Sequence, residues 1–176
     1  MKKVFYPIAT ALIILASAFT IIAVQDYKIS DGYAVKFSAA GASGIFRTLK
    51  GDISFDEKNL SASKFDVTID VASINTGNGL KNTHAKGDNW FDAKKFPVIK
   101  FTSKEITKAG NGYNAKGELE MHGVKKEINI PFTFAKSAGG GTFTGNFQVN
   151  RNDFGIGSPG GKVDDVIKLE VTVPVH

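Results

Sequence analysis

A strict two-residue alternation in residues 64–71 constrains the fold of this chain more than any other feature of its sequence. Four apolar residues alternate there with four polar ones: Phe65, Val67, Ile69 and Val71 with Lys64, Asp66, Thr68 and Asp70. Successive side chains of a strand point to opposite faces, so one face of this segment is apolar and the other is solvated. Such a pattern is typical of an antiparallel sheet with one wet face.

The same alternation recurs along the rest of the chain, and no long stretch with a helical period of 3.6 competes with it. The other segments are residues 35–37, 53–55, 99–101, 119–121, 128–134, 143–149 and 169–175. Gly110-Asn111-Gly112 and His122-Gly123 lie between such segments and predict hairpin turns. About eight strands without alternating helices predict an all-β domain, either a barrel or a sandwich.

One region lacks the strand pattern. Residues 78–96 place Leu80, His84, Trp90 and Phe91 among polar residues. We expect a loop with a short helix there, acting as a lid or plug on the sheet. No linker divides the chain after residue 25, so we expect residues 26–176 to form one domain.

The N-terminus has the pattern of an export signal. Lys2 and Lys3 precede an apolar stretch at residues 4–24, and Ala16-Ser17-Ala18 offers a cleavage pattern. The stretch is also long enough to cross a bilayer of roughly 30 Å. We therefore expect residues 1–25 to be a signal peptide or a signal anchor. The rest of the chain is then periplasmic or otherwise exported, and an uncleaved segment would hold it on the inner membrane.

Composition excludes several function classes. The chain contains no Cys, which rules out disulfides, thiolate metal sites and a cysteine nucleophile. After residue 25 it carries 20 basic and 17 acidic residues, a net charge of +3. This charge is mild and dispersed, so nucleic acid is not an expected partner.

No motif predicts catalysis, a metal or a cofactor. Residues 155–160 match G-x-G-x-x-G, but Pro159 and Gly161 break any helix that would follow, which favours a flexible loop. The three histidines have no metal-ligand spacing, and no nucleophile-elbow sequence is present. We therefore expect a non-enzymatic protein without a resident cofactor.

Two polar positions are candidates for the mouth of a cavity. Arg151 is one of only two arginines and closes a predicted strand. It could form an ion pair with Asp153 or Asp164, or contact a ligand's head group. His84 lies in the predicted plug near Trp90 and could face a pocket, but a structural or solvent-exposed role is the favoured interpretation.

Phenylalanine is the most informative residue type. The chain has 14 Phe against four Tyr and one Trp, and most Phe after residue 25 fall on the apolar faces of predicted strands. These side chains could fill an ordinary core. A barrel of about eight strands can instead hold one apolar ligand, and Phe lines such a cavity without leaving polar groups unsatisfied.

Several motifs, in this order and spacing, resemble the YceI-like family of polyisoprenoid-binding proteins. They are Asn82-Thr83-His84, Asn89-Trp90-Phe91-Asp92, Phe96-Pro97-Val98-Ile99-Lys100-Phe101, Gly117-Glu118-Leu119-Glu120-Met121-His122-Gly123 and Arg151-Asn152-Asp153-Phe154-Gly155-Ile156-Gly157. The resemblance covers residues 26–175.

The resemblance implies a lipocalin-like, extended antiparallel eight-stranded β-barrel that holds a long isoprenoid, such as a quinone or prenyl lipid, for sequestration, transport or stress protection. Its apolar lining would comprise Val35, Phe37, Phe55, Phe65, Val67, Ile69, Phe91, Ile99, Phe101, Leu119, Met121, Ile130, Phe132, Phe143, Phe147, Leu169 and Val171. His84, Trp90 and Arg151 would be polar contacts at the mouth. The protein would be a monomer or a homodimer.

Two alternatives stay open. An enzyme could act on a bound lipid through His84, Asp92 or Arg151 at the barrel mouth. A structural envelope stress protein would instead have a completely filled barrel.

Overall fold

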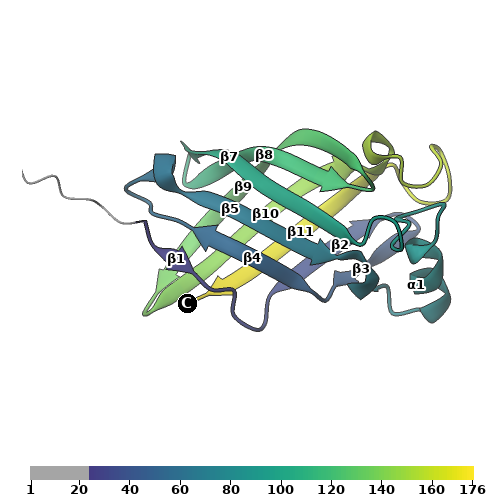
Figure 1. Cartoon of the computed structure of the whole chain (residues 1–176), viewed down its shortest axis with the longest axis horizontal. Helices are drawn as coiled ribbons and strands as arrows, with labels where there is room; N and C mark the ends of the chain where they lie inside the picture. Colours follow the sequence, from purple (N-terminus) through teal and green to yellow (C-terminus); the bar gives the residue numbers. More distant parts are fainter. Residues whose placement is uncertain (1–23) are drawn as a thin grey trace, which may run out of the picture.

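The computed structural model describes residues 24–176, most of which form one curled antiparallel sheet (Figure 1). The strands are β1 (Asp26–Tyr27), β2 (Ala34–Ala39), β3 (Ala42–Phe46), β4 (Leu49–Ser54), β5 (Lys64–Asp70), β6 (Ile74–Asn75), β7 (Val98–Ala109), β8 (Gly112–Met121), β9 (Val124–Ser137), β10 (Gly140–Asn150) and β11 (Val166–Val175). The other elements are the helix α1 (Gly79–Lys86) and the 3₁₀ turns η1 (Leu60–Ala62), η2 (Val71–Ser73) and η3 (Arg151–Phe154).

The sheet is a lipocalin-like extended barrel with the strand order β1-β4-β5-β7-β8-β9-β10-β11-β2-β3-β6. Residues 26–30 bridge its two sides at one end. Tyr27 pairs with Ile53 of β4, while Ile29 forms a bridge with Val175 of β11. The Lys28 N–H also donates a 2.8 Å hydrogen bond to the carbonyl of His176. The segment after residue 25 is therefore part of the barrel.

The predicted count of eight strands is wrong, because residues 24–176 alone contribute eleven strands to the sheet. The eight alternating segments match β2, β4, β5, β7, β8, β9, β10 and β11. The three additional strands carry little pattern: β1 and β6 have two residues each, and β3 contains Ala, Ser and Gly. Pairing with a neighbouring strand, rather than alternation of their own residues, defines them.

The predicted hairpin turns are confirmed. Ala109 pairs with Gly112 and Met121 pairs with Val124, so each hairpin loop has two residues. In the second loop His122 and Gly123 have φ angles of 53° and 75°. These angles fit a two-residue type I′ turn, which requires a positive φ at both positions. The backbone twist of such a turn matches the right-handed twist of the flanking strands.

The predicted short helix within residues 78–96 is α1, and it lies at the barrel end opposite β1 (Figure 1). The Asn78 side chain caps it by accepting a 3.0 Å hydrogen bond from the Lys81 N–H. Within residues 24–176 no helix is both long and apolar enough to span a bilayer. The export-signal prediction concerns residues 1–25, of which residues 1–23 lie outside the described part.

Candidate functional site

An apolar cavity of about 150 Å³ lies inside the barrel, between β2, β4, β5 and β7–β11. Its lining comprises Val35, Leu49, Ile53, Phe65, Val67, Ile69, Ile99, Phe101, Ala115, Leu119, Ile130, Phe132, Phe143, Gly145, Phe147, Val171 and Val173. These residues come from the inner faces that the alternation predicts. No titratable side chain is among them, so the cavity offers contact area but neither charge nor proton transfer.

Most of the predicted lining residues meet at this cavity, but Phe37, Phe55, Phe91, Met121 and Leu169 do not line it. The lining also includes residues outside the predicted set, among them Leu49, Ile53, Gly145 and Val173. Ile53 and Val173 were detectable from their place in alternating segments. Leu49 has the same parity as Ile53, four residues before it in β4. Gly145 lies between Phe143 and Phe147 on the inner face of β10, but it has no side chain to indicate a lining position.

An aromatic cluster fills the barrel end near β1. Phe55 follows β4, is 1% exposed, and packs edge-on against Tyr113, Phe134 and Phe143 at centroid distances of 5.1–5.3 Å. Tyr27 contacts the same cluster through Phe134 at 5.6 Å. Phe143 also lines the cavity, so this cluster lies at the β1 end of the cavity with Phe55 packed behind the lining.

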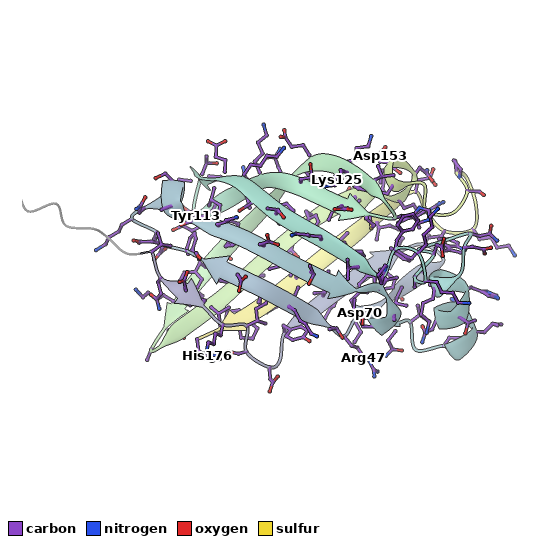
Figure 2. All side chains as sticks on the ribbon, in the orientation of Figure 1. Arg47, Asp70, Tyr113, Lys125, Asp153 and His176 are labelled. Atoms are coloured by element: carbon purple, nitrogen blue, oxygen red, sulfur yellow. The ribbon has the colours of Figure 1, made fainter. Side chains whose placement is uncertain are left out.

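Tyr113, labelled at this end in Figure 2, is a member of the cluster that carries a hydroxyl group. Its hydroxyl donates a 2.7 Å hydrogen bond to Glu57. Burial, with this hydrogen bond as a smaller cause, raises the pKa of Tyr113 to about 12. The phenol is therefore neutral below that pH and continues to donate to Glu57.

The end near α1 is packed by a second aromatic group. Phe46 contacts Phe37 at 5.6 Å and Phe91 at 5.9 Å between ring centroids. Phe91 is held beside α1 by its N–H, which donates to the carbonyl of Ala85 at 3.1 Å. His84 lies on the exposed surface of α1.

Arg151 is buried beside this end, with 4% of its side chain exposed. Its guanidinium donates to the carbonyls of residues 156, 158, 163 and 164 and to the side chains of residues 152 and 165, at 2.7–3.1 Å. Trp90 covers the guanidinium at 5.5 Å. The predicted ion-pair partners were wrong, since the carboxylate that pairs with Arg151 is that of Asp165.

This network uses all five N–H groups of Arg151. The residue is therefore a structural anchor for the loop at residues 155–165 and has no donor left for a ligand. Among residues 24–176, no three His, Asp or Glu side chains gather to hold a metal ion.

The size of the cavity sets what it can hold as it stands. An engineered apolar cavity of roughly 150 Å³ binds one benzene molecule. The space inside this barrel has the same volume. It accommodates a short piece of an apolar chain, and a longer chain has to displace lining side chains or extend out of the barrel.

Comparison with known proteins places this geometry in a family. The family model described as "YceI-like domain" matches residues 19–175. A UPF0312 protein of Vibrio parahaemolyticus is 34% identical over 120 residues, which is 64% of each chain. A UPF0312 protein of Photorhabdus laumondii matches over 44% of its own length, so the chain spans about half to two thirds of these relatives.

Two solved structures share the fold. BcnA of Burkholderia cenocepacia is 29% identical, has a TM-score of 0.77, and is covered over 96% of its chain and 82% of this one. A polyisoprenoid-binding domain from Saccharophagus degradans is 15% identical, has a TM-score of 0.64, and is covered over 99% of its chain and 88% of this one.

Proposed function

Because the chain belongs to the YceI-like family, we propose that it binds an isoprenoid lipid inside its barrel. The observation that carries this proposal is the cavity itself, which is lined without a titratable side chain. Burial of apolar surface contributes roughly 25 cal/mol per Å², so a prenyl chain can bind there with few polar contacts. The fold shared with a polyisoprenoid-binding domain supports the same ligand class.

The ligand is a prenyl lipid or quinone, of which one end segment occupies the cavity of about 150 Å³. The protein holds this ligand for sequestration, transport or stress protection rather than converting it. Two of the side chains considered for catalysis are badly placed for that work, because His84 is exposed on α1 and Arg151 is saturated by protein acceptors. The cavity also disfavours a purely structural protein with a filled barrel.

The binding proposal predicts saturable uptake of neutral prenyl probes. Farnesol, geranylgeraniol and a short prenyl quinone are titrated into the protein and followed by calorimetry. We expect one molecule bound per chain, a negative heat-capacity change from apolar burial, and little dependence on salt. Absence of saturable binding by all three probes would contradict the proposal.

The proposed function also includes export of the barrel by the N-terminal segment. Residues 1–25 would direct residues 26–176 to the periplasm or hold them at the inner membrane, where prenyl lipids reside.

A further inference from the structure

The barrel wall has a gap between β9 and β10. These strands pair only from Ser137↔Gly140 to Phe132↔Gly145. Beyond that point residues 124–131 pair with β8 alone, and residues 146–150 pair with β11 alone. The first residue of β9 past the last pair is Pro131, which has no backbone N–H to donate to a neighbouring strand.

The cavity extends to this unpaired stretch. Ile130 on β9 and Phe147 on β10 flank it, and both line the cavity. The inward side chains beside the gap, Ile128 and Val149, are half-buried, whereas the inward Phe132 at the paired end is 7% exposed. Because aromatic side chains pack both ends of the barrel, the side wall is the more open route to the interior.

Lys126 lies on the inner face of β9 beside this gap. It pairs across the sheet with Leu119, which lines the cavity. Residues directly opposite each other in an antiparallel pair project from the same face. Lys126 is exposed and, among residues 24–176, forms no ion pair within 4.0 Å.

The preceding lysine, Lys125, differs from Lys126 in both its orientation and its charge partners. Lys125 projects from the outer face, where its ammonium pairs with Glu118 at 3.0 Å and Glu120 at 3.4 Å. An ammonium whose stem lies on an apolar face and whose charge has no protein partner is suited to an anion at the surface. Lys126 and Ile130 are four residues apart, about 13 Å along a strand. A head group at Lys126 therefore leaves the first part of an attached chain at the cavity entrance.

We propose that the gap between β9 and β10 is the entrance of the site and that Lys126 binds the acidic head group, a phosphate or carboxylate, of an amphiphile. The chain of that amphiphile passes between Ile130 and Phe147 into the cavity. The proposal rests on the binding function above and adds a head-group class and an entry route to it.

Matched probes test the head-group site. Farnesol and farnesyl phosphate share one chain, palmitate supplies a carboxylate, and inorganic phosphate serves as a competitor. We expect Lys126→Gln to lower the affinity for farnesyl phosphate or palmitate about tenfold and to leave the affinity for farnesol unchanged. Lys125→Gln is the matched control and should leave every affinity unchanged.

The outcomes separate this proposal from the binding function. Suppose that farnesol binds, but Lys126→Gln and Lys125→Gln change the affinity for the acidic probes equally. That result would overturn the head-group site and leave the binding function intact. If inorganic phosphate competes with farnesyl phosphate, the protein recognises phosphate without an attached chain. That result would overturn the proposal that the ligand at Lys126 is an amphiphile. If no probe binds the unmodified protein, the binding function itself fails.

A thiol label tests the entrance, since the native chain has no cysteine. Ile128→Cys places a thiol on the inner face beside the gap, and Asn129→Cys places one on the outer face of the same strand. After reaction with N-ethylmaleimide, the association rate of farnesol should fall at least tenfold in the first variant and stay unchanged in the second. Equal rates in the two labelled proteins would show that the ligand enters elsewhere.

Discussion

Replacing Val171 by tryptophan is expected to weaken prenyl binding by roughly 30-fold, or about 2 kcal/mol. Val171 lies on the inner face of β11, between Gly145 of β10 and Val35 of β2, and all three line the cavity. The volume of about 150 Å³ matches one aromatic ring, so an indole at this position occupies the space that the ligand needs.

The control for this substitution is Glu170→Trp, which adds the same side chain to the exposed outer face of β11. Because overpacking can itself cost about 1–3 kcal/mol of stability, Val171→Phe provides a smaller filling group. Calorimetric titration with geranylgeraniol gives the affinity, and urea denaturation gives the free energy of unfolding. Equal affinities of Val171→Trp and Glu170→Trp would mean that the ligand binds outside the cavity.

Replacing Arg151 by leucine is expected to lower the free energy of unfolding by about 3 kcal/mol. The guanidinium is 4% exposed, and its loss leaves the carbonyl of Ile156 and the carboxylate of Asp165 without their shortest contacts, 2.7 Å each. Arg151→Lys retains the positive charge but not the planar set of guanidinium N–H donors. It should therefore recover only part of the lost free energy of unfolding.

Arg47 is the matched control for this prediction because it is the other arginine and is exposed. Arg47→Leu should change the free energy of unfolding by less than about 0.5 kcal/mol. Urea denaturation of the three variants measures the difference directly. A loss of less than 1 kcal/mol on Arg151→Leu would contradict the anchoring role of this side chain.

The sequence predicted the parts of the fold that depend on local pattern. The alternation of residues 64–70 places Phe65, Val67 and Ile69 on the lining of the cavity, as β5 does in the structure. The two-residue hairpin loop at His122-Gly123 was predictable for a similar reason, because turn chemistry is carried by the turn residues themselves.

Features that depend on the arrangement of distant residues were not predictable. The alternation puts Phe55 on an inner face, but its position beyond β4 makes it part of the aromatic cluster instead. The sequence indicates that Arg151 is unusual. Its ion pair with Asp165 depends on how residues 155–165 fold back over the guanidinium, which no local pattern predicts. The divergence of β9 from β10 has one local sign, Pro131, within a segment that otherwise alternates regularly.

Nuclear Overhauser contacts between a bound prenyl chain and the protein's methyl groups test the central claim most directly. With unlabelled geranylgeraniol and methyl-labelled protein, we expect contacts to Leu119, Ile130 and Val171 on the lining of the cavity. Contacts confined to the exposed apolar side chains of Leu80, Val98 and Val166 would contradict the account, because they would place the ligand on the outer surface.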